Sequence, residues 1–209
     1  MADNGQETEA KFYVRNLERI QAILQGVNAR LIQERVLETN IRFDRPDLSL
    51  RVERRVLRLR QDTKARLTYK GPGKNEQGIL SRREIEFIVE DFEKAKQFLE
   101  ALGYQKLVYY EKYRTTYEWN ETLIMLDELP YGSFVEIEGR NIASIRAIAD
   151  QLHLNWDTAI ATGYHALFER AHNALDFPFR DISFANFTGI TVDADDLDVE
   201  AADVEAADE

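Results

Sequence analysis

The sequence predicts an α+β fold in which about eight mainly antiparallel strands form a sheet with enough members to close into a barrel. Strand-like segments carry charged residues at alternate positions, and helical patterns separate some of these segments. Five pairs of like-charged residues are separated by one residue, namely Glu7/Glu9, Glu84/Glu86, Glu136/Glu138, Arg58/Arg60 and Lys112/Arg114. Because side chains alternate between the two faces of a strand, both members of each pair project to one side.

An open antiparallel sheet that shows one polar face to water would also explain a single charged strand face. Several strands with paired charges of both signs on one parity favour a different arrangement. In this arrangement the sheet closes into a barrel with a charged interior, and helices cover its apolar outer face. Apolar residues flank the pairs, as in Leu57, Leu59, Ile85, Phe87, Val135 and Ile137. Such an interior would hold metal ions and a polyanion.

The elements follow from apolar periodicity and from capping signals. We expect strands over residues 7–14, 29–44, 56–61, 65–70, 80–90, 104–118, 121–128 and 133–139. Asn16 and Asp91 are predicted N-caps of two helices, the second closed by Gly103. Further helices are expected over 141–152 and 157–172. The glycine-rich segment 71–78 lacks the spacing of a phosphate-binding loop, and a hairpin connection is the better interpretation.

Composition sets the class of protein. At 209 residues and 44% hydrophobic content, the chain can bury one good core. The absence of cysteine excludes disulfides, thiolate zinc sites and a cysteine nucleophile. No apolar run approaches the length of a membrane span, and the polar N-terminus does not resemble a signal peptide. We therefore expect a cytoplasmic protein without a membrane partner.

Charge is unevenly distributed along the chain. Nine of the eleven net negative charges come from residues 191–209, which leaves −2 for the rest. We therefore expect 1–172 to form the main domain, 173–190 a C-terminal extension, and 191–209 a disordered acidic tail whose removal leaves activity almost unchanged. The phenylalanines at 177, 179, 184 and 187 should pack onto the body rather than bind a partner. A near-neutral body argues against general nucleic-acid binding.

The residues with inward parity form a nearly balanced set. Its acids are Glu7, Glu9, Glu84, Glu86, Asp127, Glu136 and Glu138, and its bases are Lys11, Arg58, Arg60, Lys70, Lys112 and Arg114. Removing ions from water costs several kcal/mol each, so stability alone would favour apolar residues here. Carboxylates without histidine or cysteine suit Mg²⁺ or Mn²⁺. Arginine and lysine suit phosphate oxygens. The pattern indicates a site for a metal–polyphosphate complex.

The ordered series of motifs resembles the CYTH superfamily, the triphosphate tunnel metalloenzymes. It begins with the E-x-E-x-K run at residues 7–11 and continues through 57–60, 67–72, 81–86, 111–114, 126–128 and 132–138. The Leu-Thr-Tyr-Lys-Gly-Pro and Phe-Val-Glu-Ile-Glu-Gly runs are most similar to the class IV adenylate cyclase and thiamine triphosphatase-like branch.

The resemblance implies an eight-stranded tunnel and a role for each matching residue. Glu7, Glu9, Glu136 and Glu138, helped by Asp127 and by Glu84 or Glu86, would bind divalent metal ions, with two Mg²⁺ or Mn²⁺ ions expected. Lys11, Arg58, Arg60, Lys70, Lys112 and Arg114 would bind phosphate, with Arg66 and Arg82 weaker candidates. Lys11, Glu9 and Glu138 are the expected catalytic residues. Relatives often add a basic contact from a helix that closes the tunnel, but the matching stretch 161–164 has no lysine.

The predicted site is compatible with three alternative functions. The first is a metal-dependent phosphohydrolase acting on a small-molecule triphosphate. The second is an adenylate cyclase, which would need a nucleoside pocket that holds the ribose against the α-phosphate. The third is a non-catalytic polyphosphate-binding module, which would not need so many acids. The three histidines, at 153, 165 and 172, are expected to be solvated or to cap helices. The sequence leaves homodimer formation open.

Overall fold

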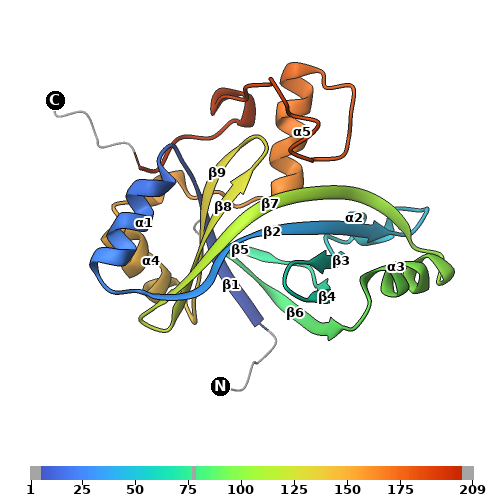
Figure 1. The fold of residues 1–209 in the computed structure, drawn as a ribbon, viewed down its shortest axis with the longest axis horizontal. Helices are drawn as coiled ribbons and strands as arrows, with labels where there is room; N and C mark the ends of the chain where they lie inside the picture. The colour runs from blue at the N-terminus through green and yellow to red at the C-terminus, as the bar shows by residue number, and fades with distance from the viewer. Residues whose placement is uncertain (1–5, 77–78, 204–209) are drawn as a thin grey trace.

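The computed structural model describes residues 6–76 and 79–203, and in this part of the chain nine strands form one antiparallel sheet (Figure 1). The strands are β1 (Gln6–Val14), β2 (Arg30–Asp44), β3 (Val56–Gln61), β4 (Ala65–Lys70), β5 (Lys74–Glu76), β6 (Ile79–Val89), β7 (Gln105–Trp119), β8 (Thr122–Leu129) and β9 (Gly132–Glu138). The order β1-β9-β8-β7-β2-β3-β4-β6 returns to β1 because β6 also pairs with β1. Eight strands therefore close into a ring, as predicted, and β5 only extends the edge of β6.

Helices lie outside this ring. They are α1 (Leu17–Gly26), α2 (Ser49–Val52), α3 (Phe92–Ala101), α4 (Ile142–Gln151) and α5 (Tyr164–Leu175), with 3₁₀ turns η1 (Trp156–Thr158) and η2 (Asp195–Leu197). Both predicted N-caps are confirmed, since Asn16 accepts from the Arg19 amide and Asp91 from the Lys94 amide. These side chains satisfy amides that a helix start leaves without partners.

Most of the buried apolar residues of the strands face outward onto the helices, whereas Ile85 and Phe87 of β6 are exposed. Helices α1 and α4 lie together over β1, β8 and β9 (Figure 1), where Phe12 and Ile137 are fully buried. Helix α3 covers β2 and β3, where Leu59 is fully buried. Burying a large apolar side chain contributes about 1.5–3 kcal/mol, so the outer faces supply the core. The alternate positions of the same strands are thereby directed to the interior of the ring.

Two predicted connections differ in detail. The predicted connection 71–78 contains a short strand, β5, that pairs antiparallel with β6, and its residues 77 and 78 lie outside the described part. The helix predicted over 157–172 begins only at Tyr164, after η1 and an extended stretch. The Ile160 amide donates to the Lys11 carbonyl at 2.7 Å, which holds this stretch beside β1. Gly163 is the N-cap, and the β-branched Ile160 and Thr162 before it favour extended backbone.

The C-terminal residues pack onto the body, which corrects the expectation of a disordered tail beginning at 191. Phe177 and Phe187 are buried in a cluster with α5, as predicted for the phenylalanines. Leu197 and Ala202 are fully buried, and the Asp203 carboxylate accepts from the amides before α1. The prediction failed because acidic composition dominated it, whereas the few apolar residues between the acids are the ones that pack. Residues 204–209 lie outside the described part, and α5 crosses the expected boundary at 172.

No helix in the described ranges has the length and apolar character needed to cross a lipid bilayer.

Candidate active site

The ring encloses a cavity of about 580 Å³ whose lining is dominated by charged side chains. Nine described basic residues line it, namely Lys11, Arg42, Arg58, Arg60, Arg66, Lys70, Arg82, Lys112 and Arg114. Seven described carboxylates line it as well, namely Glu9, Glu38, Asp62, Glu84, Glu86, Glu136 and Glu138. Every basic residue of the predicted phosphate-binding set therefore faces one cavity, and so do the weaker candidates Arg66 and Arg82.

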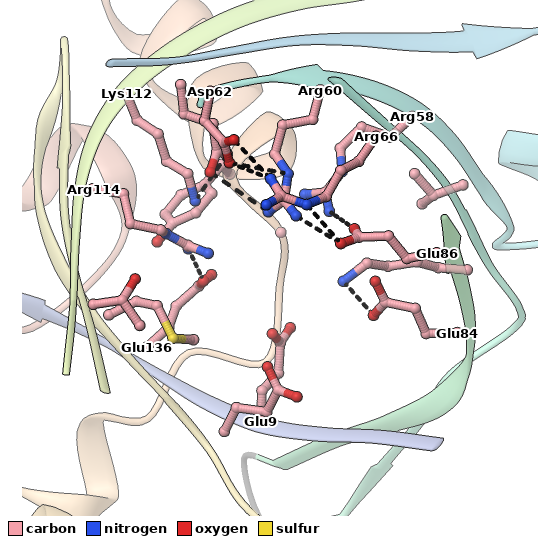
Figure 2. Close-up of a pocket in the computed structure, with 18 of the residues that line it drawn as sticks. Glu9, Arg58, Arg60, Asp62, Arg66, Glu84, Glu86, Lys112, Arg114 and Glu136 are labelled. Carbon is pink, nitrogen blue, oxygen red and sulfur yellow. Dashed lines mark hydrogen bonds and ion pairs between the residues drawn. The ribbon is translucent and has the colours of Figure 1, made fainter. Parts of the chain in front are cut away.

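Three arginines from β3 and β4 gather at one side of the cavity; we call Arg58, Arg60 and Arg66 the arginine cluster (Figure 2). Glu86 holds this cluster, because its carboxylate lies 2.8 Å from Arg60 and 3.6 Å from both Arg58 and Arg66. Asp62 binds Arg66 at 2.6 Å. Burial and the charge of Arg58 lower the pKa of Arg60. Glu38 also lies 3.6 Å from Arg60, so three arginines share three carboxylates, and their guanidinium donors suit further anionic oxygens.

Lys11 lies on β1 and is almost fully buried. Its ammonium binds Glu136 at 3.0 Å, donates to the Thr162 carbonyl at 3.3 Å and lies 4.2 Å from the centre of the Tyr164 ring. Burial alone would lower the pKa of Lys11, but the carboxylates of Glu136 and Glu9 outweigh it and raise the pKa. The same partner lowers the pKa of Glu136 in spite of its burial. Lys11 is therefore a fixed cation beside the acidic residues.

Asp127 is fully buried behind the cavity lining and orders its neighbours. Its carboxylate accepts from Lys112 at 3.0 Å, from Arg114 Nε at 2.6 Å and from the Tyr164 hydroxyl at 2.7 Å. Burial and the charges of Asp127 and Glu136 raise the pKa of Tyr164, so its hydroxyl stays a donor. Asp127, a predicted metal ligand, thus fixes two phosphate-binding candidates and the first turn of α5.

The first turn of α5 lines the cavity without contributing a lysine. Gly163, Tyr164 and His165 line the cavity, and the Tyr164 carbonyl accepts from Tyr131 at 2.7 Å. His165 was expected to be solvated or to cap a helix. Instead, only 13% of its side chain is exposed. Burial, together with the charge of Arg42, lowers its pKa to about 4.

The predicted metal ligands fall into two groups. Glu9 on β1 lies directly opposite Glu138 on β9, and Glu136 lies two residues before Glu138 on the same face. We call Glu9, Glu136 and Glu138 the acidic side. Glu84 binds Lys70 at 3.1 Å, and Glu84 and Glu86 lie across the cavity from Glu136 (Figure 2). The side chain of Glu7 lies outside the described part.

Across residues 6–76 and 79–203, no group of three or more acidic or histidine side chains is close enough together to hold a metal ion. The acidic side nevertheless fits a hard cation. Like charges directly opposite each other on paired strands are destabilising, and the donors are carboxylate oxygens only. Glu9 has Arg82 at 3.6 Å and Glu136 has Lys11, so these carboxylates would exchange their present cations for a metal.

Sequence reasoning missed three alternate residues on β2, of which Glu38 and Arg42 line the cavity. Glu38 and Asn40 are fully buried, and Glu38 lies 3.6 Å from both Lys112 and Arg60. Burial opposes ionisation of Glu38, but Lys112 and Arg114 lower its pKa strongly. Arg42 continues the same face. The alternation Glu38-x-Asn40-x-Arg42 is visible in the sequence, but the face that it occupies depends on the register shifts earlier in β2. Asp62 and Tyr110 also line the cavity and were not predicted.

Comparison with known proteins places the chain in a family. The CYTH domain family model matches residues 5–155, which is most of the chain. The chain therefore belongs to the CYTH family. Members of this family are enzymes that act on triphosphate substrates and generally use divalent metal ions.

Particular relatives carry adenylate cyclase names. A protein of Methanocaldococcus jannaschii named "Putative adenylate cyclase" is 29% identical over 134 residues, covering 63% of this chain and 75% of the relative. A Vibrio parahaemolyticus structure of the same name has a TM-score of 0.71 at 22% identity, covering 79% and 99% of the two chains. The Hippeastrum protein HpAC1, described as revealing a dominant triphosphatase activity, has a TM-score of 0.58 at 16% identity and covers 78% and 95%.

Proposed function

We propose that this protein is a divalent-metal-dependent phosphohydrolase acting on triphosphate compounds, either inorganic triphosphate or a nucleoside or thiamine triphosphate. The observation that carries the proposal is the division of one cavity into an arginine cluster and an acidic side, with Lys11 bound to Glu136 of the acidic side. The arginine cluster and the lysines suit a chain of phosphates, and the acidic side suits the cations that accompany it.

The chain's own residues would act mainly by positioning and by electrostatic stabilisation, as is general for phosphoryl transfer. Basic residues from several strands would grip the phosphate chain from more than one direction. Lys11 would bind a phosphate oxygen next to the acidic side, where its raised pKa keeps it charged. A divalent ion held by Glu9, Glu136 and Glu138 would supply a bound water of lowered pKa. Water would attack phosphorus, and the P–O bond to the leaving phosphate would break.

A second candidate is an adenylate cyclase, in which the ribose 3′-hydroxyl attacks the α-phosphate and pyrophosphate leaves. The names of the relatives support it. An apolar part of the cavity lining, formed by Val36, Leu123 and Met125, could also contact a nucleoside. We rank hydrolysis first because it needs only water and metal, and because a protein of the same fold with a cyclase name is described by its triphosphatase activity.

One experiment separates these reactions. The protein is incubated with inorganic triphosphate, ATP and thiamine triphosphate under Mg²⁺ and under Mn²⁺, and phosphate, pyrophosphate and cyclic AMP are all measured. Phosphate release from any of the three supports the hydrolase. Cyclic AMP and pyrophosphate from ATP, without phosphate from inorganic triphosphate, would establish the cyclase. Tight binding of a triphosphate with no product under either metal would favour the non-catalytic module.

A further inference from the structure

Arg42 differs from the other cations of the cavity. Its side chain faces the cavity from β2, and its Nε atom, like those of Arg58 and Arg60, is buried without a hydrogen-bond partner; the difference lies in its ion pairs. Within the described ranges, each of the other eight lining cations has a carboxylate within 4.0 Å, for example Lys70 with Glu84 and Arg82 with Glu9. No carboxylate lies within that distance of Arg42 in the same ranges.

The surroundings of Arg42 are positive rather than neutral. Arg58 lies directly opposite it on β3. Burial lowers the pKa of Arg42; Tyr110 opposes this shift, and the charges of Arg82, Arg58 and Arg51 add to it. A buried charge without a counter-ion costs several kcal/mol. Such a cost is expected where a ligand supplies the missing negative charge.

A second group of donors faces the same cavity, and it lies close enough to Arg42 for that charge to act on His165. Helix α5 begins at this end of the cavity, and its N-cap Gly163 provides no side-chain acceptor for the amides of the first turn. The N-terminus of a helix carries partial positive charge and attracts phosphate groups. His165, in this turn, is neutral near pH 7 and adds no negative charge. Arg42 and the start of α5 therefore both present donors and positive potential to the cavity, and the carboxylates at this turn bind other groups, Glu169 at His165 and Asp127 at the Tyr164 hydroxyl.

We propose that Arg42 and the N-terminus of α5 form a subsite for the free terminal phosphate of the triphosphate chain. The chain then lies in the tunnel with its terminal phosphate toward α5 and any organic group toward the other end. The inference rests on the proposed function only in that a triphosphate occupies the tunnel. It makes Arg42 a specificity-determining residue, which selects substrates whose terminal phosphate is not esterified.

The test compares three ligands by their stabilisation of the protein in thermal-shift titrations, with and without Mg²⁺. Inorganic triphosphate and ATP have a free terminal phosphate, whereas diadenosine triphosphate has none. Arg42→Gln should weaken binding of the first two by about 10- to 100-fold, the range of one charge-assisted contact. It should leave the weak binding of diadenosine triphosphate nearly unchanged. Arg42→Lys should recover part of the loss because it keeps the charge.

Arg51→Gln is the matched control, because Arg51 is exposed, lies outside the cavity lining and contributes only through-space charge. It should change all three affinities little. The unliganded melting temperature of Arg42→Gln should be equal or higher, since a buried charge without a counter-ion is removed. An equal loss for all three ligands, or no loss for any, would overturn the subsite. If the wild type binds triphosphate but releases no phosphate, the hydrolase proposal fails and the subsite stands; if it binds none of the ligands, both fail.

Discussion

Glu9 and Glu138 face each other directly across β1 and β9, so two negative charges are held at adjacent positions. A divalent ion would relieve their repulsion, and removing one charge would relieve it as well. We expect Glu9→Gln to lower turnover by at least about 100-fold at limiting Mg²⁺. This is at or above the usual loss when a residue that only hydrogen-bonds to a metal ligand is replaced. Its melting temperature should stay the same or rise.

Glu100→Gln makes the same chemical change at an exposed position of α3 and should alter neither quantity. Turnover and unfolding are measured for both variants over a series of Mg²⁺ concentrations. Normal activity of Glu9→Gln at limiting Mg²⁺ would remove Glu9 from the metal-binding set.

Asp127 has the opposite role, because its charge is needed by its neighbours. It holds Lys112, Arg114 and the Tyr164 hydroxyl at one fully buried carboxylate. Breaking a buried ion pair by removing one partner typically costs about 3–5 kcal/mol, since the remaining charge is uncompensated. We expect Asp127→Asn to lower the free energy of unfolding by about this amount, measured by urea denaturation. A stability equal to that of the wild type would show that the carboxylate serves metal or substrate binding instead.

Among the elements, α5 makes the fold sensitive to pH through His165. The pKa of His165 is lowered to about 4 from an ordinary 6.5, first by burial and then by Arg42, while Glu169 opposes the shift and Arg51 and Arg180 add to it. Between these pH values the unfolded chain binds more protons than the folded one, so stability rises with pH. The contribution is complete above about pH 6.5 and is lost as pH falls toward 4, with a maximum of about 3 kcal/mol.

This prediction is measured as the difference in unfolding free energy between wild type and His165→Asn at pH 7 and at pH 4.5. The difference should move in favour of the variant at the lower pH. His153→Asn, at an exposed position, is the control and should show no such change. If the two variants behave alike, His165 is not held neutral by its surroundings.

The elements also show where sequence reasoning was sufficient and where it failed. Strands β3, β7 and β9 follow strict alternation, so Arg58, Lys112 and Glu136 were placed correctly in the interior. Strand β2 contains register shifts between Leu31 and Gln33 and between Gln33 and Val36. A bulge reverses the parity of the residues that follow it, and pairing with β7 decides its position. The sequence alone therefore does not decide whether Glu38 faces the interior or the outside, as the exposed charges of the same strand do.

At the scale of the whole molecule, the C-terminal segment joins β1, α1 and α5. Leu197 is fully buried, Ala202 donates to the Tyr13 carbonyl at 2.8 Å, and Asp203 accepts from the amides at the start of α1. Composition does not predict that this segment is ordered, because the residues that it contacts lie far from it in the sequence. We expect deletion of 191–209 to destabilise the protein, contrary to what composition alone indicates.

Burial of Leu197 alone contributes about 1.5–3 kcal/mol, and loss of the Asp203 interaction adds about 1 kcal/mol. For a domain of this size the melting temperature should fall by about 10 °C. Leu197→Ala should reproduce part of the fall, and Asp195→Asn, at an exposed position of the same segment, should not. An unchanged melting temperature after truncation would mean that the segment contributes nothing to stability.

The distribution of cations around the ring sets the preferred length of the ligand. Lys11 comes from β1, Arg58 from β3, Lys70 from β4 and Arg114 from β7, so a single phosphate can reach only some of them. A longer chain of linked phosphates contacts more of these residues, and each charge-assisted contact contributes about 1.5–3 kcal/mol. Inorganic triphosphate should therefore bind at least about tenfold more tightly than diphosphate, and diphosphate more tightly than phosphate. Calorimetric titration at two salt concentrations measures this series, and the longest ligand should lose most affinity at high salt because it makes the most ionic contacts. Equal affinities for diphosphate and triphosphate would mean that only one part of the ring binds phosphate, and the tunnel would then not be built for a triphosphate chain.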